Sequence, residues 1–125
     1  MLEPGKFSTA TTVVSEKNTA KTVGSGNLDV FSTPMMIALM EQAACDCLAS
    51  SLEPGQSSVG TEIAVEHKAA SPIGATISAT ATIKHVEGRK VDFDVIAAEG
   101  ATTIGCGTHS RFIIDAERFM SKLRR

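Results

Sequence analysis

Three polar residues occupy positions that the pattern of the chain otherwise assigns to an apolar interior. Glu41 directly follows an uninterrupted apolar run, residues 35–40, in a segment that predicts one helix. His67 ends a predicted strand, and Thr33 lies at the start of the predicted helix, where free backbone N–H groups can bind an oxyanion. A carboxylate, an imidazole and a helix N-terminus together favour acid–base or nucleophilic chemistry on a carbonyl compound.

Each of these residues also has a purely structural interpretation. Thr33 is a good N-cap residue, which by itself would explain its position. His67 could be a structural or partly exposed histidine. Glu41 could be a satisfied acid of the core or turn towards an open edge, although a carboxylate in an apolar helix is costly unless it is paired or needed.

The other two histidines are weaker candidates. His85 lies at the end of a predicted hairpin. His109 shares the parity of Arg111, and we expect the opposite parity, that of Phe112 and Ile114, to face the core. The sequence has no Gly-x-Ser-x-Gly motif, no phosphate-binding glycine loop and no group of histidines and carboxylates at metal-ligand spacing. We therefore expect no metal site.

One long helix over residues 33–48 must position two of the three candidate groups. Ser32 or Thr33 suits its N-cap, and Pro34 suits the first turn because the missing N–H is not needed there. Met, Leu and Ala then dominate, and the lack of a polar stripe predicts a helix that is buried on most sides. We expect the helix to end near residues 50–52, before a Glu-Pro-Gly breaker.

Alternation of polar and apolar residues predicts strands over most of the remaining chain. Tight turns between successive strands favour an antiparallel meander with one covered and one solvated face. The predicted strands are residues 6–16, 57–67, 76–85, 90–97 and 102–114, and a short basic amphipathic helix is expected at residues 116–125.

Parity then predicts which side chains of two strands should meet the helix. In the second predicted strand, the face that carries His67 also carries Val59, Thr61, Ile63 and Val65. In the last predicted strand, the apolar parity is that of Ile104, Cys106, Phe112 and Ile114.

These elements predict one α+β domain over residues 1–125, with an antiparallel sheet curled around a single buried helix. A chain of 125 residues can bury one core of useful size. The net charge of −2 and the absence of Trp and Tyr give no support for nucleic-acid binding.

Cysteine usage and hydropathy bear on the cellular location. The sequence shows no signal peptide and no apolar run long enough to span a bilayer, so no membrane association is expected. An odd number of cysteines favours the reduced cytoplasm. We expect Cys45, Cys47 and Cys106 to be small core residues rather than metal ligands.

A helix wrapped by an antiparallel meander resembles the hot-dog fold, and several segments resemble its fluoroacetyl-CoA thioesterase family. One is Phe31-Ser32-Thr33-Pro34, with Glu41 eight residues after Thr33. Another is the strand that ends at His67, twenty-six residues after Glu41. The sequences Val-Glu-Gly-Arg at 86–89 and Ile-Gly-Cys-Gly-Thr-His-Ser-Arg-Phe at 104–112 are also similar, so the resemblance covers most of the chain.

The resemblance implies hydrolysis of an acyl-CoA thioester. It places the catalytic residues of the family on Thr33, Glu41 and His67, and its pocket residues on Gly60 and Arg111. It also implies a homodimer, or a dimer of dimers, with the pocket at the dimer interface. No metal is implied, and no cofactor except the coenzyme A that belongs to the substrate.

Two mechanisms fit these residues. Glu41 would act as a general base on water or attack the carbonyl directly to give a transient anhydride, while His67 would orient a group or shuttle a proton. Main-chain N–H groups of Met35 and Met36, or those near the pocket glycine, would polarise the carbonyl oxygen. If Thr33 caps the helix, it lies about 12 Å from Glu41 along the axis, too far for a direct hydrogen bond.

Two other functions also fit the sequence: dehydration of a hydroxyacyl thioester, and non-catalytic binding of acyl-CoA or another hydrophobic ligand. One departure from the family concerns the substrate. The fluoroacetyl-specific enzyme closes its pocket with phenylalanines shortly before the helix, and the matching stretch here is Gly-Ser-Gly-Asn at 24–27. This predicts a thioesterase for short or medium acyl groups without fluoroacetyl specificity.

Overall fold

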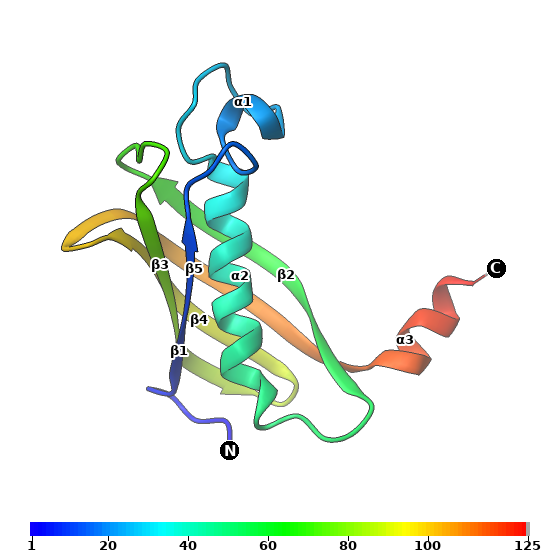
Figure 1. The fold of residues 1–125 in the computed structure, drawn as a ribbon. Coiled ribbons are helices and arrows are strands. Elements are labelled where there is room, and N and C mark those ends of the chain that lie inside the picture. The colour runs from blue at the N-terminus through cyan, green and yellow to red at the C-terminus, as the bar shows by residue number, and fades with distance from the viewer. Residues whose placement is uncertain (125) are drawn as a thin grey trace.

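The computed structural model describes residues 1–124, which form a five-stranded antiparallel sheet with a long helix across one face (Figure 1). This arrangement confirms the predicted α+β class and the hot-dog architecture. The elements in chain order are β1 (Phe7–Val13), α1 (Ala20–Val23), α2 (Thr33–Ala49), β2 (Gln56–His67), β3 (Thr76–Glu87), β4 (Lys90–Glu99), β5 (Thr102–Asp115) and α3 (Ala116–Leu123).

The start of α2 is set by one side chain. Ser32 is the N-cap, and its Oγ accepts a hydrogen bond of 3.2 Å from the backbone N–H of Met35. Pro34 lies in the first turn, as its missing N–H predicts. Thr33 is therefore the first helical residue and not the cap, which leaves its hydroxyl free for a different partner.

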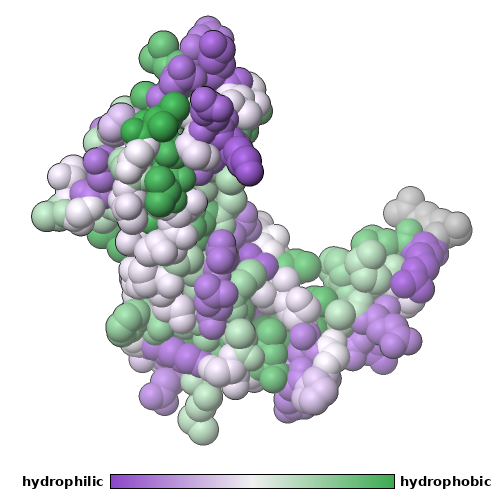
Figure 2. Space-filling view, viewed as in Figure 1, coloured by the Kyte–Doolittle hydropathy of each residue, from purple (hydrophilic) through white to green (hydrophobic). Residues whose placement is uncertain are grey.

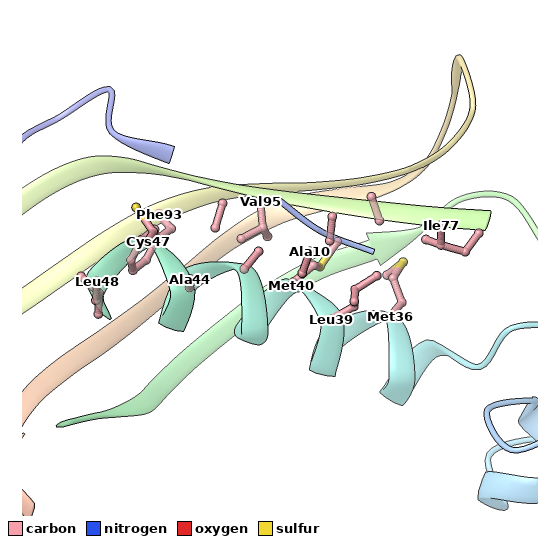
Figure 3. Packing of buried hydrophobic residues seen from close by; sticks show 14 of the residues in the cluster. Ala10, Met36, Leu39, Met40, Ala44, Cys47, Leu48, Ile77, Phe93 and Val95 are labelled. Carbon is pink, nitrogen blue, oxygen red and sulfur yellow. The ribbon is translucent and has the colours of Figure 1, made fainter. Parts of the chain in front are cut away.

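Helix α2 is buried on one side only, so the expectation of burial on most sides was wrong for this chain. The buried side faces the sheet, where α2 packs mainly on β1 and β3 (Figure 3). A single sheet can cover only one side of a helix, and the other side has no covering layer. The buried residues are Met36, Leu39, Met40, Ala43, Ala44, Cys47 and Leu48, and the exposed ones include Met35, Ala38, Gln42, Cys45 and Asp46.

The three cysteines differ in burial. Cys47 is fully buried, as predicted, and burial raises the pKa of its thiol. Cys45 is exposed and Cys106 is half-buried, so neither is the core residue that was expected.

The strand order is β1-β3-β4-β5-β2. The predicted meander is correct for β3, β4 and β5, which pair in succession through tight turns. It is wrong for β2, which does not pair with β3 but lies at the opposite edge beside β5. Strands β1 and β2 are thus the two edges of the sheet.

A β-bulge in β2 changes which side chains face the helix. Gly60 pairs with Arg111 and Glu62 with the preceding residue of β5, so Thr61 is an extra residue. An extra residue inverts the alternation of the strand. The inward face therefore carries Ser58 and Gly60 before the bulge, and not Val59 and Thr61 as parity had predicted; Ile63, Val65 and His67 face inward as expected.

A second irregularity inverts the predicted parity of β5. Ala97 pairs with Gly105 and Ala98 with Thr103, which makes Ile104 an extra residue. From Gly105 onward the odd-numbered residues face the interior. As a result His109 and Arg111 are buried, at 2% and 6% exposed, while Phe112 is 42% exposed.

The C-terminal helix α3 projects from the end of β5 away from the body of the molecule (Figures 1 and 2). Asp115 caps its first turn by accepting from the N–H of Arg118. None of its described residues is buried. No helix within residues 1–124 is long and apolar enough to cross a membrane.

Candidate active site

Thr33 and His67, at the start of α2 and the end of β2, form a hydrogen-bonded pair. Thr33 Oγ1 lies 2.8 Å from Nδ1 of His67. Nε2 of His67 is buried and has no hydrogen-bond partner within residues 1–124. Burial lowers the pKa of this imidazole below its ordinary 6.5, and the main chain at Ala69 opposes part of that shift. The ring is therefore neutral near pH 7, with one nitrogen held by Thr33 and the other without a protein partner.

A glycine on β5 leaves room for a side chain of α2 beside the end of β2. Gly105 pairs with His67 across the sheet. A Cβ at Gly105 would lie 2.6 Å from Sδ of Met36 in the first turns of α2. A side chain at this position would displace the Met36 side chain and would lie 2.7 Å from the carbonyl oxygen of Glu66 on β2.

The Thr33–His67 pair lines a cavity of about 240 Å³. One wall comes from the segment around α1, which supplies Ala20 and Ser25. Gly24 ends α1 in the left-handed region, at φ 87°, and so turns the chain towards this cavity. The remaining lining residues are Val30, Phe31, Lys68, Ala69 and Ala70.

Glu41 lies in a second group of residues, two turns further along α2. Its Oε2 is 3.4 Å from Nη1 of Arg111 and 3.9 Å from Nε2 of His109. The Glu41 side chain is 40% exposed, whereas that of Arg111 is only 8% exposed. The carboxylate therefore has a buried cation on one side and remains accessible to solvent on the other, where a cavity of about 210 Å³ lies.

Gly60 provides the space that this carboxylate occupies. A Cβ at position 60 would lie 2.6 Å from Oε2 of Glu41, 3.2 Å from Cε1 of His109 and 3.3 Å from Nη1 of Arg111. A real Cβ would thus displace the Glu41 carboxylate. The predicted pocket glycine is placed beside Glu41 by the bulge at Thr61, which turns Gly60 inward.

Arg111 is held by a residue that sequence reasoning missed. Its Nε donates to Ser58 Oγ at 2.9 Å, and its Nη2 donates to the carbonyl oxygen of Ser58 at 3.1 Å. Before the bulge was known, parity assigned Ser58 to the outer face, so no sequence signal pointed to it.

His109 is the second missed residue. It was set aside because its parity opposed Phe112, but the bulge at Ile104 turns it inward beside Arg111. The ring stacks on Phe93, with centroids 6.1 Å apart. Its shared parity with Arg111 was a usable signal, because any structure that buries one of the two buries both. His85, the other weak candidate, is exposed.

The structure thus brings the five predicted residues together as two neighbouring groups. Thr33 pairs with His67, while Glu41 meets Gly60 and Arg111; no hydrogen bond joins the two groups. On α2, Thr33 and Glu41 are separated by about 12 Å of helix axis, as predicted. On β2, His67 and Gly60 face the same interior.

One predicted oxyanion site is wrong. The backbone N–H of Met35 already donates to Ser32 Oγ, and that of Met36 donates to the carbonyl oxygen of Ser32 at 3.0 Å. These donors are used by the helix cap. The arrangement that remains is a partly exposed carboxylate paired with a cation, and a separate neutral imidazole that lines another cavity. A carboxylate and an imidazole suit proton transfer from water or nucleophilic attack on a carbonyl.

Comparison with known proteins shows the family to which the sequence and the fold are similar. Residues 14–117 match the family described as fluoroacetyl-CoA-specific thioesterase. The fluoroacetyl-CoA thioesterase of Streptantibioticus cattleyicolor is 46% identical over 96 residues, which are 77% of this chain and 69% of the relative. A crystal structure of a fluoroacetyl-CoA thioesterase is 38% identical with a TM-score of 0.93, covering 99% of this chain and 96% of that one. A hypothetical protein of Thermus thermophilus, described as a thioesterase superfamily member, is 26% identical with a TM-score of 0.90, covering 98% and 91%.

Proposed function

Because the chain belongs to the fluoroacetyl-CoA-specific thioesterase family, we propose that it hydrolyses a short or medium acyl-CoA thioester. One observation carries the proposal: the Glu41 side chain is 40% exposed at a cavity, and its carboxylate forms an ion pair with the buried Arg111. A carboxylate with a purely structural role in the core would be enclosed by other side chains. A related enzyme of this family, 38% identical, has been crystallised with fluoroacetate and CoA, which supports a CoA thioester as substrate.

Glu41 is the residue that starts the reaction in this proposal. As general base it removes a proton from water while the water oxygen attacks the thioester carbonyl carbon. As nucleophile it attacks that carbon itself, and water then hydrolyses the resulting anhydride. In both cases the C–S bond breaks, and the products are a carboxylic acid and the CoA thiol. Nη1 of Arg111, 3.4 Å from Oε2 of Glu41, compensates the negative charge of the carboxylate.

His67 and Thr33 serve the leaving group in this proposal. The neutral His67 lines the cavity, and Thr33 contacts its ring at Nδ1 while Nε2 is buried without a hydrogen-bond partner within residues 1–124. A fixed, neutral imidazole can pass a proton to the departing thiolate through water, since about 12 Å of helix axis separates this pair from Glu41. The reaction uses side chains and water only, and coenzyme A enters as part of the substrate.

We also propose that the working unit is a homodimer, or a dimer of dimers, in the cytoplasm. Strand β2 carries His67 and Gly60 and lies at an open edge of the sheet. Unpaired strand edges favour pairing with a second copy. The side of α2 turned away from the sheet is also uncovered in the single chain. Three free cysteines agree with a reducing compartment.

A thiol-release assay across acyl-CoAs of increasing chain length tests the proposed hydrolysis. Glu41→Gln keeps the shape of the side chain but removes the base, so it should lower turnover by at least about 10²-fold. Glu66→Gln is the matched control, because Glu66 is an exposed carboxylate elsewhere on β2. A Glu41→Gln protein that retains wild-type turnover would refute the assignment. A wild-type protein that binds acyl-CoA without releasing thiol would instead identify a binding module.

A further inference from the structure

We infer that His109 is a positioning residue, which acts through Arg111 to hold the Glu41 carboxylate in place. This inference rests on the proposed function, in which Glu41 does the chemistry. His109 itself is 2% exposed and does not need to touch the substrate. The argument depends on which of its two nitrogens carries a proton.

A backbone carbonyl determines the tautomer of His109. Nδ1 lies 2.8 Å from the carbonyl oxygen of Glu62. A carbonyl oxygen can only accept, so Nδ1 must carry the proton and donate it. The bulge at Thr61 sets the register at which Glu62 faces this ring. In the neutral ring, Nε2 is then left with a lone pair.

That lone pair accepts a hydrogen bond from Arg111. Nη1 of Arg111 lies 3.2 Å from Nε2 of His109 and 3.4 Å from Oε2 of Glu41. Arginine can only donate, so the same nitrogen serves both acceptors with its two N–H groups. The 3.9 Å between His109 Nε2 and Glu41 Oε2 joins two acceptors, and Arg111 lies between them as the shared donor.

The two other anchors of Arg111 do not involve Nη1. Nε and Nη2 are tied to Ser58, on the side of the guanidinium away from Glu41. His109 supplies the acceptor for Nη1, the remaining nitrogen of the planar guanidinium group. The ring cannot tilt away, because it is stacked on Phe93 and bonded to Glu62. Burial and the nearby Arg111 both lower the pKa of His109, which keeps its lone pair available.

A double-mutant cycle separates this role from that of a core filler. His109→Leu removes the acceptor and should lower kcat by about 10²-fold, since misplacing a catalytic group by about 1 Å has this effect. KM should change less than kcat, because His109 itself does not contact the substrate in this proposal. His109→Gln, whose amide keeps one donor and one acceptor, should recover most of the loss.

Arg111 provides the second arm of the cycle. If His109 acts through Arg111, the variant with both His109→Leu and Arg111→Ala should be no slower than Arg111→Ala alone. His85→Leu is the control, since His85 is exposed on a hairpin. Losses that multiply in the double variant, or wild-type kcat in folded His109→Leu, would overturn the inference.

A nitrogen NMR spectrum of histidine-labelled protein tests the geometry without any assay. The chain has three histidines, and the signals of His109 are those absent in His109→Gln. We expect a proton on Nδ1 and none on Nε2 at pH 7, and a shift of the Nε2 signal in Arg111→Ala. A proton on Nε2, or no response to Arg111→Ala, would contradict the inference. If the wild type released no thiol from any acyl-CoA, the proposed function would fail, and this spectrum would still decide how His109 is held.

Discussion

The hydroxyl of Thr33 lies 2.8 Å from Nδ1 of His67, although the two residues are 34 positions apart in the chain. This contact exists because Ser32 caps helix α2 in place of Thr33. Gly105, which pairs with His67 across the sheet, leaves room there for the Met36 side chain of the same helix. The first prediction follows from this pair.

Thr33→Val should lower kcat by about 10-fold to 10²-fold without unfolding the protein. Valine keeps the shape but removes the hydrogen bond that orients His67, and oriented acid–base groups contribute on the order of 10²-fold or more. Steady-state thiol release measures the effect. The control is Thr80→Val, which removes a hydroxyl from the exposed Thr9–Thr80 pair. An unchanged kcat in Thr33→Val would show that Thr33 is only a helix residue.

Gly60→Ala should lower kcat at least about 10²-fold. The new Cβ would fall 2.6 Å from Oε2 of Glu41, so the carboxylate must leave its place beside Arg111. Ala64→Val, on the outer face of the same strand, is the control for a bulkier residue in β2. Full activity in Gly60→Ala would mean that the carboxylate works from another position.

Acidification below pH 6.5 should destabilise the folded protein through the half-buried His67 and the buried His109. Burial lowers the folded-state pKa of His67 and His109 below the ordinary value of 6.5. Between the unfolded and folded pKa values the unfolded chain binds more protons, so stability falls as the pH drops through that window. Above the window both states are neutral and the effect vanishes.

Urea unfolding at about pH 7.5 and about pH 5.5 measures this loss. The loss of free energy of unfolding should be smaller in His109→Gln than in the wild type, because glutamine does not titrate. In His85→Gln, where the exposed side chain is replaced, the loss should match that of the wild type. Equal losses in His109→Gln and wild type would contradict a buried neutral His109.

The protein should show no strong preference for fluoroacetyl-CoA over acetyl-CoA. The cavity beside His67 is walled on one side by Ser25, within the Gly-rich stretch at 24–27, and a small polar side chain cannot close over an acyl group. Without a tight enclosure, a one-atom difference in the acyl group changes kcat/KM only modestly. We expect the two substrates to differ by less than about 10-fold, with butyryl and branched acyl groups tolerated.

Parallel measurements of kcat/KM for fluoroacetyl-, acetyl-, butyryl- and a branched acyl-CoA, under one set of conditions, test this prediction. Ser25→Phe should restrict the range to the smaller acyl groups, while Ser57→Phe, on the exposed outer side of β2, should not. A preference for fluoroacetyl-CoA of about 10⁴ or more would show that another segment closes the pocket.

The protein should sediment as a dimer or a dimer of dimers at micromolar concentration. Both edges of the sheet, β1 and β2, lack a neighbour in the single chain, and the outer side of α2 exposes Met35 at 36%. Analytical ultracentrifugation with activity measured on the same sample is the test. A stable monomer with full activity would contradict it.

Local signals in the sequence were sufficient for the helix and the strands. Pro34, the apolar run after it and the breaker near residue 54 predict α2 closely, because helix starts and stops depend on neighbouring residues. Alternation predicts β3 and β4 well, since both strands bury every second residue against α2. Together these elements led to the hot-dog architecture, and similarity to a known family pointed to Thr33, Glu41 and His67.

Tertiary structure decided which side chains meet. Two bulges, at Thr61 and Ile104, each add a single residue and invert the alternation that parity relies on, and neither has a local signature strong enough to predict. They turn Gly60, His109 and Arg111 inward, and so create the surroundings of Glu41. A bulge forms only when a strand pairs with its neighbour. Strand β2 pairs with β5, and β3 and β4 lie between them in the sequence, so the geometry of this site arises from long-range pairing.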